Sequence, residues 1–316
     1  MALGCMGMSG MYGPADDEES IRTIHAALDH GVTLLDTRDF YGIGHNEMLL
    51  GRALKNRRDK AVLSVKFGAL RSPDGGWVGY DARPAAVKNS LAHSLTRLGV
   101  DYIDIYRPAR LDARVPVEDT IGAIAELVQA GYVRAIGFSE VGPETIRRAN
   151  EVHPICDLQI EYSLISRGPE TGIFPVLDAL GIGVSAYGLL SRGLLSGWVP
   201  ESPADIRGHF PRFAGDNLRQ NKKLILALAE LAAERGLQPA QLAIAWGLAK
   251  SKTLVAVGGV RTQRQLEENL GALAVDLSPE ELARIENAVP ASAVAGNRYP
   301  DPHMKDLDSE ASAQGS

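Results

Sequence analysis

The chain has 316 residues, 45% of them hydrophobic, and a formal net charge of −6 at pH 7. This length and apolar content allow a sizeable core, in one large domain or two ordinary ones. The acidic balance, without a cluster of Lys and Arg, argues against nucleic-acid binding by phosphate neutralisation, and no apolar run approaches the roughly 20 residues that cross a bilayer.

The first residues, "MALGCMGMSGMYG", have no basic region before an apolar one, so they indicate a strand and a turn, not a signal peptide. Cys5 and Cys156 each lie in an apolar run, which predicts buried thiols in a cytoplasmic protein. The seven histidines are scattered, so the sequence predicts no metal site.

Eight short β-rich runs recur along the chain. They are Ala2–Met6, Val32–Asp36, Ala61–Phe67, Tyr102–Tyr106, Val133–Phe138, Ile155–Ile160, Gly183–Tyr187 and Leu254–Val257. Helical patterns separate them, which favours a parallel sheet with right-handed crossovers. With this count and length, the sequence predicts a closed (β/α)8 TIM barrel, class α/β, in a single domain of residues 1–301, followed by a polar, flexible tail at 302–316.

The intervening helices are predicted from apolar residues at helical spacing. They are Glu18–His30, Arg83–Leu98, Pro116–Ala130, Asn221–Arg235, Pro239–Lys250, Thr262–Leu273 and Pro279–Ala288, with Pro143 and Pro169 in first turns. A doubly wound open sheet is the alternative fold. It needs a helix directly after the glycine-rich "GCMGMSG", where residues 11–14 indicate a loop.

Polar side chains at strand ends are the candidates for chemistry, because barrel active sites lie at the carboxyl ends of the strands. Asp36 ends the second run and Lys66 lies near the end of the third. Buried on adjacent strands, the two must pair. That pair is either purely structural or part of a site with Tyr41, because a lysine ammonium beside a phenol lowers its pKa and makes it a usable proton donor.

Six segments, in order along nearly the whole chain, resemble the aldo-keto reductase family. They are "LDTRDFYGIGHNEMLLGRAL", "VKFG", "IGFSEVG", "LQIEYSL", "SAYGLLSRGLLSG" and "GGVRTQRQLEENLGAL". The resemblance is to an NADP-dependent branch like aryl-alcohol dehydrogenases and pyridoxal reductases. It implies Tyr41 as the general acid, tuned by Lys66 and Asp36.

The resemblance also implies a cofactor site for NADPH (NADP+). Ser139, Glu140 and Gln159 match positions that hold the nicotinamide carboxamide, and Tyr187 matches the aromatic residue that stacks on the nicotinamide. The positions that match the pyrophosphate loop, the 2′-phosphate site and the adenine site are Gly188, Leu190, Arg192, Gly259, Arg261, Gln265, Glu268 and Asn269. An arginine fork at Arg261 suits a 2′-phosphate, which favours NADPH over NADH.

Three departures from the family pattern stand out. Ala109 occupies the position of the family's usual catalytic histidine, and Arg38 the position of a small residue. The chain also starts essentially at its first strand, without the family's preceding hairpin. Arg107, His45 or water would then take over the orienting role of the histidine.

Arg38, Arg107 and Ala109 are the predicted substrate-pocket residues. Arg38, Arg107 and Arg110 either bind an anionic group on the substrate or pair with Asp39, Asp104 and Asp112. The first of these alternatives makes the substrate a charged carbonyl compound.

The sequence thus predicts an NADP-dependent aldo-keto reductase, an oxidoreductase acting on CH-OH groups, that reduces an aldehyde or ketone to an alcohol. The alternatives are an NADPH-binding regulatory or sensor subunit with vestigial activity, and a cofactor-free barrel hydrolase or isomerase. The expected partner is a small carbonyl substrate, without nucleic acid or membrane, and a cytoplasmic monomer is the default.

Overall fold

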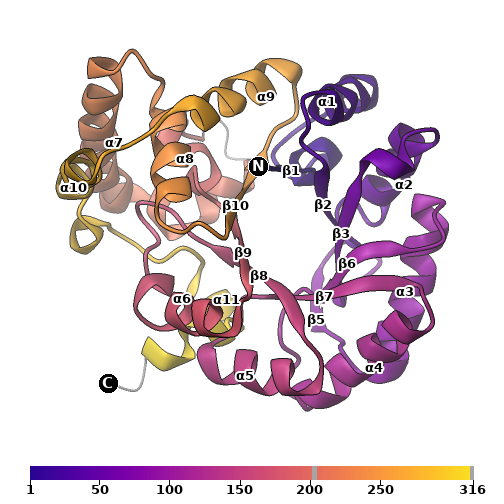
Figure 1. The fold of residues 1–316 in the computed structure, drawn as a ribbon. Coiled ribbons are helices and arrows are strands. Elements are labelled where there is room, and N and C mark those ends of the chain that lie inside the picture. The colour runs from indigo at the N-terminus through magenta and orange to yellow at the C-terminus, as the bar shows by residue number, and fades with distance from the viewer. Residues whose placement is uncertain (201–204, 314–316) are drawn as a thin grey trace.

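Eight parallel strands close into a barrel in the computed structural model, which describes residues 1–200 and 205–313 (Figure 1). Around the barrel the order is β1, β10, β9, β8, β7, β6, β3, β2. The strands are β1 (Ala2–Gly4), β2 (Leu34–Arg38), β3 (Val62–Phe67), β6 (Ile103–Pro108), β7 (Val133–Ser139), β8 (Ile155–Glu161), β9 (Gly183–Tyr187) and β10 (Leu254–Gly259). The predicted (β/α)8 fold and all eight strands are confirmed.

Helices surround the barrel in Figure 1. They are α1 (Asp17–Asp29), α2 (His45–Leu54), α3 (Pro84–Leu98), α4 (Val117–Gln129), α5 (Pro143–Val152), α6 (Pro169–Leu180), α7 (Gly215–Glu234), α8 (Pro239–Ala249), α9 (Gln263–Leu270), α10 (Pro279–Ala288) and α11 (Asp301–Met304). Local sequence sets several starts: Asp16 and Thr262 accept backbone hydrogen bonds as N-caps, Ser278 opens a capping box, and prolines occupy first turns.

The structure differs from the sequence prediction in several elements. Helix α2 follows Tyr41, where no helix was predicted, so His45 is helical. A hairpin of β4 (Ala69–Arg71) and β5 (Trp77–Tyr80) stands at the barrel mouth. Helix α7 begins six residues before the predicted start at Asn221.

Cys156 is exposed, contrary to the prediction of a buried thiol, whereas Cys5 is buried as expected. Both neighbours of Cys156 on β8, Ile155 and Asp157, are buried. Side chains alternate between the two faces of a strand, so Cys156 points away from the barrel interior even though its run is apolar.

The end of the chain packs back onto the barrel. Leu307 is 3% exposed, Asp308 accepts a hydrogen bond from the backbone of Gly142, and Ser309 donates one to Glu140. These contacts hold the tail at the mouth near β7, while the flexibility expected of residues 302–316 stays a prediction.

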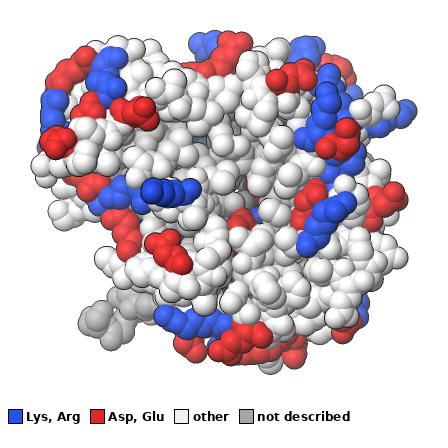
Figure 2. All heavy atoms as spheres, viewed as in Figure 1, with Lys and Arg blue, Asp and Glu red and all other residues white. Residues whose placement is uncertain are grey.

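Acidic and basic side chains alternate around the rim of the face in Figure 2, and mostly uncharged atoms surround its hollowed centre. Within residues 1–200 and 205–313, no helix is long and apolar enough to cross a membrane.

Candidate active site

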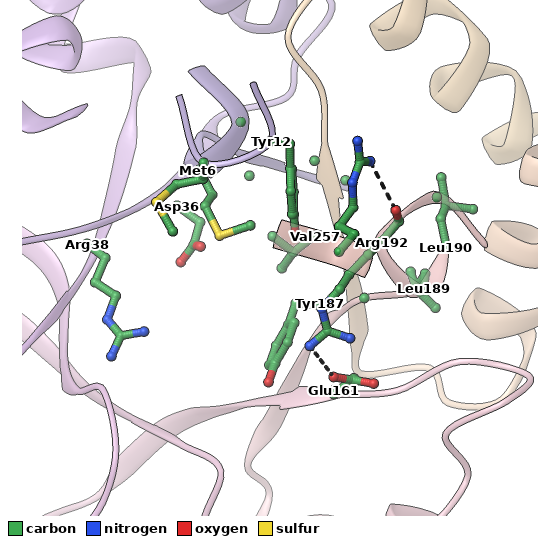
Figure 3. Close-up of a pocket in the computed structure, with 18 of the residues that line it drawn as sticks. Met6, Tyr12, Asp36, Arg38, Glu161, Tyr187, Leu189, Leu190, Arg192 and Val257 are labelled. Carbon is green, nitrogen blue, oxygen red and sulfur yellow. Dashed lines mark hydrogen bonds and ion pairs between the residues drawn. The ribbon is translucent and has the colours of Figure 1, made fainter. Parts of the chain in front are cut away.

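A cavity of about 700 Å³ lies at the carboxyl ends of the barrel strands. Its walls contain fifteen of the predicted site residues: Asp36, Arg38, Tyr41, Lys66, Ser139, Gln159, Tyr187, Gly188, Leu190, Arg192, Gly259, Arg261, Gln265, Glu268 and Asn269. Arg107, Ala109 and Glu140 are not among the lining residues. In Figure 3, Asp36 and Arg38 lie on one side of the pocket and Arg192 and Leu190 on the other.

Asp36 and Lys66 form a buried ion pair on neighbouring strands. Lys66 Nζ lies 2.6 Å from Asp36 Oδ2, and both side chains are at most 6% exposed. The other carboxylate oxygen, Oδ1, accepts hydrogen bonds from Ser64 at 3.2 Å and from Gln159 at 2.8 Å. The Lys66 ammonium is 5.6 Å from the ring centroid of Tyr41, so lysine and phenol share one wall of the cavity.

Burial is the largest cause of the pKa shifts of Lys66 and Tyr41. It lowers the pKa of Lys66 to about 8, against the opposing effect of Asp36. Burial, and then Asp36, raise the pKa of Tyr41 above its ordinary value. That direction is opposite to the lowering expected from Lys66, and it keeps Tyr41 protonated at neutral pH, as a proton donor requires.

The nicotinamide-type positions divide into two groups. Ser139, Gln159 and Tyr187 face the cavity from β7, β8 and β9. Glu140 does not: its carboxylate is buried, accepts hydrogen bonds from Tyr187 and Ser309, and forms an ion pair with Arg298. Its predicted contact with the cofactor therefore has no support, because the chain's own residues occupy the carboxylate.

Glycine backbone and an arginine side chain, those of Gly259 and Arg261, line the far end of the cavity. Apart from its chain neighbours, no described residue has an atom within 4 Å of where a Cβ on Gly259 would stand, so its backbone is open to a ligand. Arg261 donates from Nη1 only to a backbone carbonyl, that of Pro14 at 3.3 Å, which leaves its guanidinium without a carboxylate partner in the described chain. Exposed glycine backbone beside a guanidinium fits a phosphate group.

Arg192 is a partly buried residue of this wall and not a free surface charge. Its side chain is 9% exposed and lies 3.4 Å from the Glu161 carboxylate. Its guanidinium stacks 4.2 Å above the ring of Phe210 and 4.7 Å from that of Tyr299. These contacts fix the side chain at the edge of the pocket, where the sequence placed it.

The prediction that Arg107 lies in the substrate pocket is wrong. Arg107 is fully buried, donates to Asp157 at 3.0 Å and to Ser64 at 2.9 Å, and lies inside the barrel beneath the site. Ala109 is also fully buried, and its amide donates to the carbonyl of Phe67. His45 contacts Ser9 and Asp17 on the outside, and neither Arg107 nor His45 lines the cavity, so neither is placed to take the orienting role expected of it.

Two of the three acidic partners expected for the mouth arginines pair with other arginines, and the third, Asp39, accepts a hydrogen bond from the backbone of Gly68. Asp104 pairs with Arg58 and Arg134, and Asp112 pairs with Arg114. Arg110 instead donates to the carbonyl of Ala109 and to Ser139.

The family model described as "Aldo/keto reductase family" matches residues 1–290. The chain is 41% identical over 308 residues to "Probable aldo-keto reductase 1" of Glycine max, covering 95% of this chain and 88% of that protein. The chain belongs to the aldo/keto reductase family.

Two members with solved structures resemble it, and each alignment covers at least 92% of both chains. The glycerol dehydrogenase AKR11B4 of Gluconobacter oxydans has a TM-score of 0.84 at 32% identity, and an aldo/keto reductase of Klebsiella pneumoniae, solved with NADP and acetate, has one of 0.73 at 26%.

This aldo/keto reductase has an aromatic cavity wall that the sequence did not reveal. The lining includes Tyr12, Phe40, Trp77, Tyr80, Trp198 and Tyr299. Phe40 makes edge contacts with Tyr41 at 5.3 Å and with Trp77 at 6.3 Å between ring centroids. These residues lie in mouth loops, so strand-end patterns do not find them; aromatic residues in loops that follow barrel strands were the available signal.

Proposed function

We propose that this aldo/keto reductase uses NADPH to reduce an aldehyde or ketone to the alcohol. The observation that carries the proposal is the buried Asp36–Lys66 pair beside Tyr41 in a cavity large enough for a small molecule. NADPH, when bound, supplies a hydride for the carbonyl carbon, while the protein holds the substrate and donates a proton.

Tyr41 is the proposed proton donor. Its hydroxyl gives a proton to the carbonyl oxygen, which completes the alcohol, and the neighbouring ammonium stabilises the phenolate that is left. Asp36 keeps Lys66 in place and favours its charged form, the only form that provides this stabilisation.

The far end of the cavity is the proposed site for the cofactor's phosphates. The backbone of Gly188 and Gly259 would contact the phosphates, and the guanidinium groups of Arg192 and Arg261 would balance their charge. Ser139 and Gln159 are polar groups for the carboxamide, and Tyr187 is a stacking surface for the ring. The binding of NADP by the Klebsiella relative supports this assignment.

The test is the Tyr41→Phe variant. We expect kcat/KM with NADPH and an aldehyde panel to fall by about 10²- to 10⁴-fold, because the proton donor is lost. NADPH binding, followed by cofactor fluorescence, should persist. Tyr132→Phe is the matched control, since Tyr132 is 48% exposed and lies outside the site. Undiminished turnover by Tyr41→Phe would refute the assignment.

A further inference from the structure

Arg38 is a buried arginine that faces the cavity. On β2 it lies two residues after Asp36, so the two side chains share the inner face of the barrel. It is in register with Lys66 on β3. Its guanidinium stacks 4.2 Å from the centroid of the Phe40 ring, and the residue lines the cavity. In Figure 3 the side chain reaches into the pocket, and no dashed line joins it to another of the residues drawn.

The guanidinium of Arg38 has no polar partner within the described chain. The residue is 8% exposed, and its Nε and Nη2 are buried without a hydrogen bond. A guanidinium does not escape burial by losing its proton, and an uncompensated buried charge is strongly unfavourable. Such a group is retained at this cost where a ligand supplies the missing acceptor.

Asp39, the next residue along the chain, does not line the cavity and accepts a hydrogen bond from the backbone amide of Gly68. Two acidic side chains that do line it are already engaged. Asp36 is paired with Lys66, and Glu161, on the other side, lies within 3.6 Å of Arg192, Arg212 and Arg298. Arg110 adds a second buried guanidinium to the lining, with hydrogen bonds to one carbonyl and one hydroxyl. The substrate side of the cavity therefore carries excess positive charge.

The surroundings of Arg38 define the complementary ligand. A guanidinium binds a carboxylate through two parallel hydrogen bonds. Beside it, Phe40, Trp77 and Tyr80 form an aromatic wall through edge contacts. The matching molecule carries an anionic end for Arg38 and an apolar body for the rings.

We propose that Arg38 determines specificity by binding the carboxylate of the substrate, so that the protein prefers oxo acids with an apolar body over neutral carbonyl compounds. This inference rests on the proposed reductase function and names its substrate class.

The test compares 4-formylbenzoate with its methyl ester, which differ in charge but share the aldehyde. We expect wild-type kcat/KM to favour the carboxylate, and Arg38→Met to reduce the carboxylate-to-ester ratio by about 10- to 100-fold through the KM of the carboxylate. Arg38→Lys should retain part of the ratio. Arg148→Met is the matched control, because Arg148 is an exposed arginine that pairs with Glu118 and does not line the cavity. An unchanged ratio in Arg38→Met, or an equal loss in Arg148→Met, overturns the proposal.

A role for Arg38 at the reacting carbonyl gives a different result: the rates on acid and ester fall together and the ratio stays constant, which also overturns the proposal. A binding measurement separates the inference from the reductase function. Calorimetric titration of the NADP+-saturated protein with 4-(hydroxymethyl)benzoate, and with its amide, needs no turnover. Binding of the acid that Arg38→Met weakens by about 10-fold or more supports the inference even if no aldehyde is reduced. Equal affinity in both proteins overturns it.

Discussion

Arg298 forms a buried ion pair with Glu140 across 158 residues of sequence, with hydrogen bonds of 3.0 and 2.5 Å to the two carboxylate oxygens. Glu140 directly follows β7 and has a left-handed backbone with φ of 57°. Ser309 and Tyr187 also donate hydrogen bonds to the same carboxylate. The pair ties the segment just before the tail to a strand end beside the cavity, and Ser309 adds a contact from the tail itself.

Arg298→Met is expected to destabilise the protein by about 3–5 kcal/mol, because it leaves the Glu140 carboxylate buried without its cation. Urea unfolding followed by circular dichroism measures this loss. The tail should also become easier to cleave, which limited proteolysis detects. The double variant Glu140→Gln, Arg298→Met should recover part of the stability, since no buried charge is left alone.

Arg148→Met is the matched control for this loss. Arg148 pairs with Glu118 at 2.8 Å, but both side chains are more than 40% exposed. An exposed pair contributes about 0–1 kcal/mol. Equal destabilisation by Arg298→Met and Arg148→Met would contradict the role assigned to the buried pair.

Acid should weaken the same contact. Burial, the largest single effect, would raise the pKa of Glu140, but the combined effects of Arg298, Arg110 and Tyr187 hold that pKa at about 2. A depressed carboxyl pKa stabilises the fold above the unfolded-state value of about 4.5, and this contribution is lost as pH falls toward 2. In urea titrations from pH 6 to 2, wild type should therefore lose roughly 3 kcal/mol more than Glu140→Gln. Parallel curves would contradict the shifted pKa.

The repeating architecture and the ion pair at its centre were predictable from local patterns. Short β-rich runs alternate with 3.6-residue periodicity, and two ionisable residues at the ends of adjacent strands, Asp36 and Lys66, must meet if both are buried. The hairpin at 69–80 was not predictable in this way, because Gly75, Gly76 and Gly79 interrupt any β pattern in the sequence.

The orientation of the arginines and the long-range contacts needed the structure. Arg38 and Arg107 both lie at or near the end of a barrel strand, yet one faces the cavity and the other meets Asp157 inside the barrel. The pattern of a strand predicts which side chains face the barrel interior. It does not predict how deep in the barrel the charged end of a long side chain lies. The bond between Glu140 and Arg298 joins the end of β7 to the segment before the tail, and no local sequence signal encodes a contact at that separation.

The pH dependence of reduction tests the electrostatics of Lys66. The proposed chemistry needs the ammonium form, and the pKa of Lys66 is about 8, so kcat/KM should fall tenfold per pH unit above that value. Asp36 raises this pKa and Arg38 lowers it. The descending limb should therefore move to lower pH in Asp36→Asn and to higher pH in Arg38→Met. If the descending limb moved in the same direction in both variants, the opposite effects of Asp36 and Arg38 on the pKa of Lys66 would be contradicted.

The buried pair beneath the site should matter for stability in the same way as the pair at the tail. Asp157 accepts hydrogen bonds from Arg107 at 3.0 Å and from Ser185 at 2.5 Å, and Arg107 reaches Ser64, which in turn contacts Asp36. Asp157→Ala leaves Arg107 charged and without its carboxylate inside the barrel, so it should cost about 3–5 kcal/mol in urea unfolding.

Replacing both partners tests whether the isolated charge, and not the lost contact, causes that cost. The double variant Arg107→Met, Asp157→Leu removes both charges and fills much of the same volume, so it should be more stable than Asp157→Ala. Gly137→Ala probes the packing around the pair without changing any charge, because its added Cβ would stand 2.5 Å from Asp157 Oδ1 and 3.0 Å from Arg107 Cζ. Overpacking of this kind costs about 1–3 kcal/mol. If the double variant is no more stable than Asp157→Ala, the isolated charge does not cause the loss of stability. The loss would then come from packing.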